Sequence, residues 1–250
     1  MAEQARTGSV RLQHRLLPPL LALLLLLLLT FWVALQTLNR QQIAFHSQEQ
    51  SRRTAAAFEI IREERTQAMD LAMKSFIGMD PELAPMIAAA DRAALRRHYA
   101  IAFSLFNDRL AVSHFYFHGP DRRTVLRMHD PGLHGDRIER ETLLRAAQAW
   151  APSSGLELGR NGELSLRGVH PIGTPNEPVG FLELGIDVDD LLADLREKLG
   201  EDGDVEFAVA IRKRSQLGRQ WYATAQSRGA VEGWDRHPEL AVTDISEGFP

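Results

Sequence analysis

The chain has 250 residues, of which 44% are hydrophobic and 25% charged, a balance typical of a folded protein with one large or two small domains. Its net charge of −4 gives no basic surface for DNA or RNA, so we expect no nucleic-acid partner. The absence of cysteine excludes disulfides, zinc–cysteine sites and thiol catalysis.

The N-terminal segment predicts a membrane helix. A near-continuous apolar run covers residues 16–38, about the length of one bilayer crossing. Positively charged side chains precede it in residues 1–15, which places that segment in the cytoplasm and the rest of the chain outside. A cleaved signal peptide is the alternative, but residues 35–38 offer no small-x-small cleavage site and the run is long for a signal peptide.

A long helix is predicted over residues 39–77, which contain neither proline nor glycine. Apolar residues recur there at helical spacing: Ala55, Phe58, Ile61, Ala68, Leu71, Ala72 and Phe76. At 1.5 Å per residue this helix would extend about 55 Å, more than the width of a small domain. Two interpretations stay open, a spacer that covers one face of a sheet and a signalling helix that forms a homodimer.

Capping residues mark the helices that follow. Asp80 as N-cap and Pro81 at the first helical position predict a short helix to Ala90. Asp91 is the predicted cap of a helix that runs to about Leu110. Two more helices are predicted over residues 139–150 and 188–199.

Residues 114–129 predict a β-hairpin, because apolar and polar residues alternate on both sides of the turn at 119–122. With Pro120 and Asp121 at the centre of the turn, Phe117 would lie opposite Thr124, and His114 opposite Arg127. One face of the hairpin is then apolar and the other polar. The apolar face holds Phe115, Phe117, Leu126 and Met128, and the polar face holds His114, Tyr116, Arg127 and His129.

Further strands are predicted over residues 156–160, 163–171 and 179–187, and one more over 205–211. A three-residue loop at 160–162, with Gly162 in a left-handed conformation, gives the first two of these strands one apolar face. That face carries Leu156, Leu158, Leu164 and Leu166, whereas Glu157, Ser165 and Arg167 lie on the other. The remainder of the chain to residue 250 is sparse in apolar residues.

Several short stretches together resemble the Cache sensory domains, in particular the double sensory domain of bacterial two-component kinases and chemoreceptors. They are His114-Phe115-Tyr116-Phe117-His118, Val125-Leu126-Arg127-Met128-His129, Gly135-Asp136, Gly155-Leu156-Glu157-Leu158-Gly159, Leu166-Arg167-Gly168-Val169-His170-Pro171 and Val179-Gly180-Phe181-Leu182-Glu183. The resemblance implies an α+β fold in which a PAS-like antiparallel five-stranded sheet has flanking helices. It also implies a single-pass protein of the inner (cytoplasmic) membrane with its folded domain in the periplasm.

The resemblance divides the chain into a Cache-type sensory domain at residues 78–199 and a segment at 200–250 that is either the start of a second module or a C-terminal extension. The second membrane helix and the kinase or cyclase output domain of such receptors are not found in this sequence. Two interpretations therefore stay open, a fragment of a larger receptor and a stand-alone sensor. We expect no enzymatic activity from the chain itself.

The polar strand faces predict a pocket for a small anionic ligand such as a carboxylate. Arg127 would supply a bidentate fork, and neighbouring imidazole and hydroxyl groups further hydrogen bonds. The predicted ligand-binding residues are His114, Tyr116, Arg127, His129, Asp136 and Arg167. The alternative is internal pairing, of Arg127 with Asp136 and of Arg167 with Glu157.

Other functions have weaker sequence support. Five of the nine histidines fall between His114 and His170, which suggests a metal-binding domain, but no pair shows the helical i, i+4 spacing of a metalloprotease motif. We therefore expect no metal site. No nucleophile elbow or phosphate-binding glycine loop is present, so we predict no catalytic residue and no cofactor. A membrane-anchored structural or assembly protein that binds a partner protein is the alternative to a ligand sensor.

Overall fold

The structure is a computed structural model that describes residues 3–159, 164–199, 208–212 and 238–245. Two compact units divide the chain, residues 1–55 and 56–250, and helix α1 (Glu3–Met79) contributes to both. In the first unit, residues Pro18–Gln42 form a helical stretch with a mean hydropathy of 2.4. By length and composition this stretch could cross a membrane, in agreement with the apolar run seen in the sequence.

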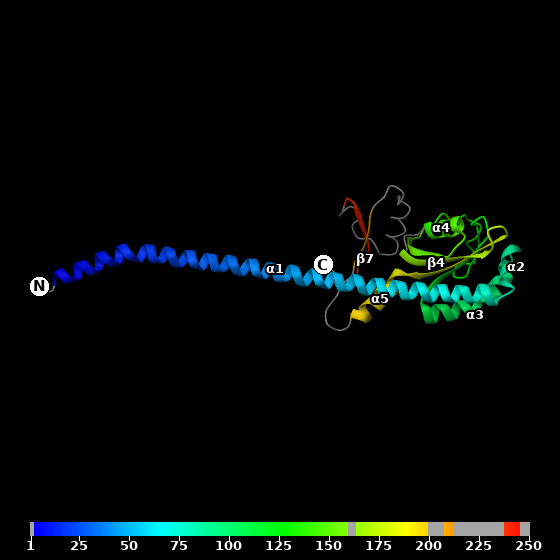
Figure 1. Cartoon of the computed structure of the whole chain (residues 1–250), viewed down its shortest axis with the longest axis horizontal. Helices are drawn as coiled ribbons and strands as arrows, with labels where there is room; N and C mark the ends of the chain where they lie inside the picture. The colour runs from blue at the N-terminus through cyan, green and yellow to red at the C-terminus, as the bar shows by residue number, and fades with distance from the viewer. Residues whose placement is uncertain (1–2, 160–163, 200–207, 213–237, 246–250) are drawn as a thin grey trace. The chain divides into compact units, whose positions relative to one another are not determined.

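Five strands form the antiparallel sheet of the second unit, in the order β2-β1-β5-β4-β3. Figure 1 shows α4 on one side of this sheet and the later part of α1 with α3 on the other. The predicted α+β class with flanking helices is therefore confirmed. The strands are β1 (Val112–His118), β2 (Thr124–Arg127), β3 (Ser153–Leu158), β4 (Leu164–Gly173) and β5 (Pro178–Asp187), and the further helices are α2 (Leu83–Ala88), α3 (Arg92–Leu110), α4 (Glu141–Ala149) and α5 (Val188–Leu199).

One of the two predicted N-caps is confirmed. Asp91 caps α3, where its carboxylate accepts a hydrogen bond of 2.9 Å from the Ala94 amide. The prediction for Asp80 is wrong, because α2 begins only at Leu83 and Asp80 instead precedes a turn. Its carboxylate accepts from the Glu82 amide at 3.0 Å and also bonds Tyr99 of α3, so it ties the turn to the next helix.

The register predicted for the first hairpin is wrong by two residues. Phe117 pairs with Leu126, and Tyr116 rather than His114 lies opposite Arg127. The loop is longer than two residues because Arg122 takes a left-handed conformation (φ 66°) and a bulge follows Phe117. A shift of two residues returns every side chain to its original face, so the predicted apolar and polar faces survive the error.

The register predicted for the second hairpin is confirmed. Leu158 pairs with Leu164, and Leu156 with Leu166, as the three-residue loop requires. The loop itself, including Gly162, lies outside the described residues. Beyond α5, β6 (Ala208–Arg212) forms a two-stranded sheet with β7 (Leu240–Ile245). Strand β6 confirms the described part of the strand predicted at 205–211, whereas β7 was not predicted.

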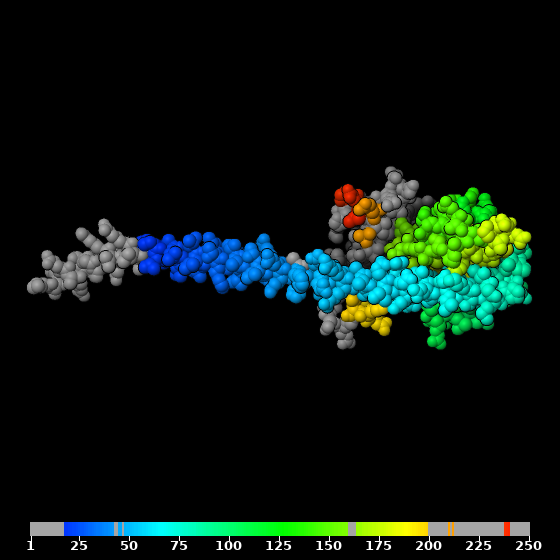
Figure 2. Space-filling view, viewed as in Figure 1, coloured from blue at the N-terminus to red at the C-terminus, as the bar shows by residue number. Residues whose placement is uncertain are grey.

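The main core lies between the sheet and helices α1, α2, α3 and α5. Its largest fully buried side chains include Phe115 and Phe117 of β1 and Tyr99 of α3. Helix α1 lies close to β4. A Cβ added at Gly168 of β4 would lie only 3.0 Å from the Met73 Cε of α1. Figure 2 shows this part of α1, in light blue and cyan, against the green and yellow strands. A smaller apolar cluster around Leu143 joins α4 to the opposite face of the sheet.

The buried stripe of α1 differs from the predicted one. Ile61 is buried as expected, but Met69 and Met73 complete the buried stripe, and Leu71 is 67% exposed. Leu71 lies two positions from Met69, about 200° around the helix, and therefore faces away from the sheet. The flexible methionine side chains fill the narrow space above Gly168.

Substitution of Met69 and Leu71 tests this orientation of α1. We expect Met69→Ala to lower the free energy of unfolding by about 2–4 kcal/mol, because it opens a cavity under a fully buried side chain. Leu71→Ala in the same helix should change it by less than about 0.5 kcal/mol. Urea denaturation of the whole chain in detergent measures both, and equal losses would mean that α1 is rotated relative to this structure.

Candidate functional site

Polar side chains gather on the face of the sheet opposite the main core. They are buried or partly buried although most carry charge or hydrogen-bonding groups. They come from all five strands of the sheet and from the segments that lead into and form α4. We call this set the polar cluster. Its members are His114, Tyr116, His118, Arg127, Asp136, Arg140, Thr142, Glu157, Ser165, Arg167 and Glu183.

Gly185 of β5 makes room for the centre of the polar cluster. It pairs with His114 on one side and with Arg167 on the other. A Cβ at this position would lie 3.0 Å from the Arg167 Cδ and 3.1 Å from the His114 Cβ. The two side chains can therefore meet only because residue 185 is glycine.

Arg127 is held by Asp136. Its two terminal nitrogens donate to the two carboxylate oxygens at 2.8 Å each, and Nη1 also donates to the Leu133 carbonyl at 2.6 Å. This is the internal pair that the sequence offered as the alternative to ligand binding. The pair fixes the loop before α4 to strand β2.

Glu183 is fully buried and collects three partners. His118 Nε2 lies 3.0 Å from one carboxylate oxygen, while Arg167 Nη1 donates to the other at 3.1 Å and Arg140 bonds the same oxygen. Burial alone would raise the pKa of Glu183. The charge of Arg140 and the contacts with His118 and Arg167 instead hold this pKa well below its ordinary value, so the group stays ionised.

The predicted pairing of Arg167 with Glu157 is wrong. Glu157 accepts hydrogen bonds from the Thr142 amide at 2.6 Å and from its hydroxyl at 2.9 Å. A carboxylate at this position satisfies a free amide of the first turn of α4 and complements the helix dipole. Arg167 pairs instead with Glu183 and donates to the Ser165 hydroxyl at 2.7 Å.

Tyr116 lies at the middle of the positive charge. The guanidinium carbons of Arg127, Arg140 and Arg167 lie 5.2, 5.3 and 5.3 Å from the centre of its ring. Such distances are typical of cation–π contacts, in which the ring face partly offsets the repulsion among the three cations.

Two imidazoles complete the site. His114 stacks parallel to the Tyr116 ring at 6.0 Å, and His129 lies edge-on to that ring at 5.0 Å. His114 is buried, whereas His129 is exposed and marks the side on which the polar cluster reaches solvent. Burial and the charge of Arg167 lower the pKa of His114 to about 2. The His129 ring is partly desolvated where it packs against His114 and Tyr116, and this desolvation, with the charge of Arg167, holds the pKa of His129 below its ordinary value.

Two buried donors in the polar cluster make no hydrogen bond, Nη2 of Arg167 and Nε of Arg140. Nη2 of Arg167 is buried and makes no hydrogen bond, although the whole side chain is 0% exposed. Leaving such a donor unpaired costs about 1–3 kcal/mol, and more for a charged group. A ligand oxygen placed beside Tyr116 and His114 would recover this cost.

The structure thus brings together all six residues predicted to bind a ligand, but only Arg167 keeps a buried donor without a partner. Sequence analysis missed His118, Arg140 and Glu183 as members of the site. Glu183 had a signal, since it is a single charged residue in the apolar stretch 179–186. Arg140 lies in a loop and had none.

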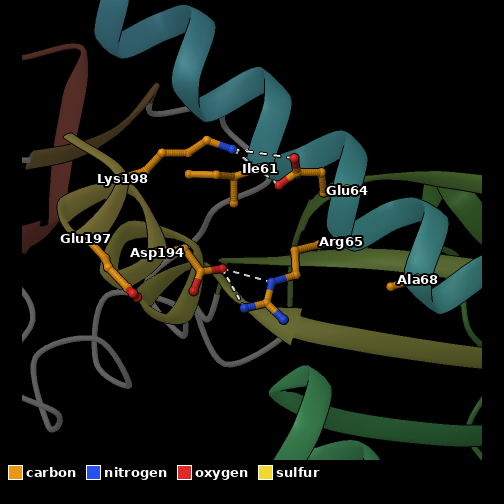
Figure 3. A pocket seen from close by; sticks show the side chains of 7 residues that line it. All are labelled: Ile61, Glu64, Arg65, Ala68, Asp194, Glu197 and Lys198. Atoms are coloured by element: carbon orange, nitrogen blue, oxygen red, sulfur yellow. Dashed lines mark hydrogen bonds and ion pairs between the residues drawn. The ribbon is translucent and has the colours of Figure 1, made fainter. Parts of the chain in front are cut away.

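A separate groove of about 500 Å³ lies between α1 and α5 (Figure 3). Two ion pairs cross it, Arg65 with Asp194 at 2.7 Å and Lys198 with Glu64 at 3.4 Å, as the dashed lines show. Most of the charges that line this groove are therefore already paired with one another. We interpret it as the junction that holds α5 against α1.

Metal coordination has no support in the described part of the chain. No group of three histidine, aspartate or glutamate side chains is arranged there to hold an ion. His170, the last histidine of the cluster seen in the sequence, instead pairs with Asp70 of α1 at 2.6 Å.

Comparison with known families and structures adds a second line of observation. A family model described as the double sensory domain of two-component sensor kinases matches residues 46–226. This family is a sensory one, not a catalytic one. No curated protein is significantly similar to the chain in sequence.

Several solved sensor domains are similar to the chain at low sequence identity. The Escherichia coli DcuS sensor domain is 11% identical over 54% of this chain and 98% of its own length, with a TM-score of 0.45. The Vibrio cholerae histidine kinase DctB sensor domain is 14% identical over 64% of this chain, with a TM-score of 0.44, and the chain spans only 62% of its length. The Campylobacter jejuni chemoreceptor Tlp3 sensory domain, solved with isoleucine bound, is 10% identical over 62% of this chain and 69% of its own, with a TM-score of 0.35.

Substitution of Gly185 tests the packing of the polar cluster. We expect Gly185→Ala to lower the free energy of unfolding by about 1–3 kcal/mol, because the new methyl group meets Arg167 and His114. Gly78→Ala is the matched control, since a Cβ there has no neighbour within 4 Å. Thermal and urea denaturation measure both, and equal behaviour of the two variants would contradict the close approach at Gly185.

The lowered pKa of His114 predicts that the free energy of unfolding decreases as the pH falls. Below pH 6.5 the unfolded chain protonates this imidazole while the folded protein does not, so stability that is present at neutral pH is lost as the pH falls. Between pH 7 and pH 5 this group should account for a loss of about 1–2 kcal/mol. We expect His114→Gln to flatten the pH profile of urea unfolding, whereas replacing the exposed His134 should leave it unchanged.

Proposed function

The chain belongs to the family of double sensory domains of two-component sensor kinases, and we propose that it is the extracytoplasmic sensing part of a membrane-anchored bacterial receptor that binds a small anion such as a carboxylate. The observation that carries the proposal is the buried, unpartnered Nη2 of Arg167. A guanidinium nitrogen of this kind, beside the neutral imidazole of His114, is a suitable donor for a carboxylate oxygen.

The proposed ligand enters from the side of His129, where the polar cluster reaches solvent. There it would lie over Tyr116 and accept a hydrogen bond from Arg167. Arg127 would act as a positioning residue, because its terminal nitrogens are engaged by Asp136 and Leu133. This is a narrower role than the sequence suggested for Arg127.

In the proposed topology α1 crosses the inner membrane once, through Pro18–Gln42. The basic residues that precede this stretch favour a cytoplasmic N-terminus, which leaves the sheet domain in the periplasm. A homodimer through α1 is part of the same proposal, since α1 exposes the apolar side chains of Phe45 and Ile60.

The proposed signal passes along strand β5. This strand carries Glu183 and Gly185 of the site and continues directly into α5 at Val188. Helix α5 pairs with α1 through Asp194 and Lys198 (Figure 3). A ligand that binds one arrangement of Arg167 and Glu183 better than another would shift the population of α5 and α1 positions.

A thermal-shift screen of the whole chain in detergent tests the proposed function. We expect small carboxylates to raise the melting temperature by mass action and neutral sugars to leave it unchanged. The Arg167→Lys variant keeps the positive charge but loses the fork, so its response should largely disappear. The matched control is Arg123→Lys, at an exposed arginine of the neighbouring loop, and it should respond as the native protein does.

Failure of every carboxylate to shift the native protein would overturn the anion proposal. It would favour the alternative, a membrane-anchored assembly protein that binds a partner protein. Leu71 on α1, with Ile101 and Leu105 on α3, are exposed apolar side chains that such a partner would cover.

A further inference from the structure

The charge pairing inside the polar cluster restricts which anions it can accept. Each of its three carboxylates is already bound to other groups of the site. Asp136 takes both terminal nitrogens of Arg127. Glu183 is shared by Arg140, Arg167 and His118, and Glu157 is bonded to Thr142 and lies 3.5 Å from the Arg140 Nε.

An ammonium group would therefore find poor conditions beside Tyr116. It brings three donors and no acceptor, so it needs free oxygens. The buried groups of the polar cluster that make no hydrogen bond are both donors, Nη2 of Arg167 and Nε of Arg140. An ammonium would also be a fourth cation around a ring that already has three guanidinium groups within 5.3 Å of its centre.

Carboxylates at the rim are the one place where an ammonium could be accommodated. Asp187 lies 3.5 Å from the His114 Nδ1, and its side chain is 36% exposed. Asp130 is exposed beside His129. Asp130 is exposed and the Asp187 side chain is partly exposed, so water weakens their interaction with a charged ligand. The Oδ1 atom of Asp187 is itself buried.

We propose that this site selects carboxylates that carry no ammonium group, such as simple hydroxy acids and dicarboxylates, over the corresponding amino acids. The inference rests on the proposed function, because it concerns the same site. It goes beyond that function by naming the chemical feature that the site rejects. The physical reason is that the polar cluster has a donor to offer but has already committed its own carboxylates to arginine.

Isosteric ligand pairs test the inference on the native chain. L-lactate and L-alanine differ by a hydroxyl in place of an ammonium, as do L-malate and L-aspartate. Isothermal titration of the whole protein in detergent should give a Kd at least about tenfold lower for the hydroxy acid of the better-binding pair. The comparison needs no variant, so it does not depend on a mutant that folds.

Three outcomes decide the matter. Tighter binding of the hydroxy acids, lost in Arg167→Lys, supports the inference. Equal or tighter binding of the amino acids overturns the inference and leaves the proposed anion site intact. If the Asp187→Asn variant then lost its binding of amino acids, the ammonium group would lie at the rim, beside Asp187. Binding of neither member of either pair, together with no response to any other carboxylate, overturns the proposed function and this inference with it.

Discussion

The fully buried carboxylate of Glu183 is the group on which the polar side of this domain depends. It joins β5 to β4 through Arg167, to β1 through His118 and to the segment before α4 through Arg140. Burying these charges is expensive, and the cost is offset only because several hydrogen bonds converge on one acceptor. Removing the carboxylate would take away the acidic partner of the buried Arg167 and leave Arg140 with Glu157 alone, so the network acts as a single unit.

The same network explains why the site is both rigid and incomplete. Three arginines surround Tyr116. Both terminal nitrogens of Arg127 are bound by the protein, whereas Nη2 of Arg167 and Nε of Arg140 are buried without a hydrogen bond. A site of this kind needs little reorganisation to take an acceptor, since the donor is already positioned and stripped of water. Burial and, after it, the charge of Arg167 lower the pKa of His114, so its imidazole stays neutral there.

Two faces of one sheet thus serve different purposes. The apolar face packs on α1 through Met69 and Met73, whose approach is possible because residue 168 is glycine. The polar face carries the network around Glu183. Strand β5 contributes to both faces and runs into α5, whose ion pairs with Glu64 and Arg65 tie it to α1. The polar face is therefore connected to α5 through the backbone of β5, and α5 is connected to α1 through ion pairs.

The sequence by itself determined the helices, the five strands of the sheet and the two faces of its hairpins, because periodicity and capping are local properties. Alternation also placed His114, Tyr116, Arg127 and His129 on one polar face, and Arg167 on the polar face of another hairpin. Only the tertiary structure decided their partners. Arg167 pairs with Glu183 rather than Glu157, because the first turn of α4 takes Glu157, and Leu71 faces away from the sheet, because the methionines fit above Gly168. These pairings and this packing depend on segments that are far apart in the sequence and close in space. A local sequence pattern therefore does not predict them.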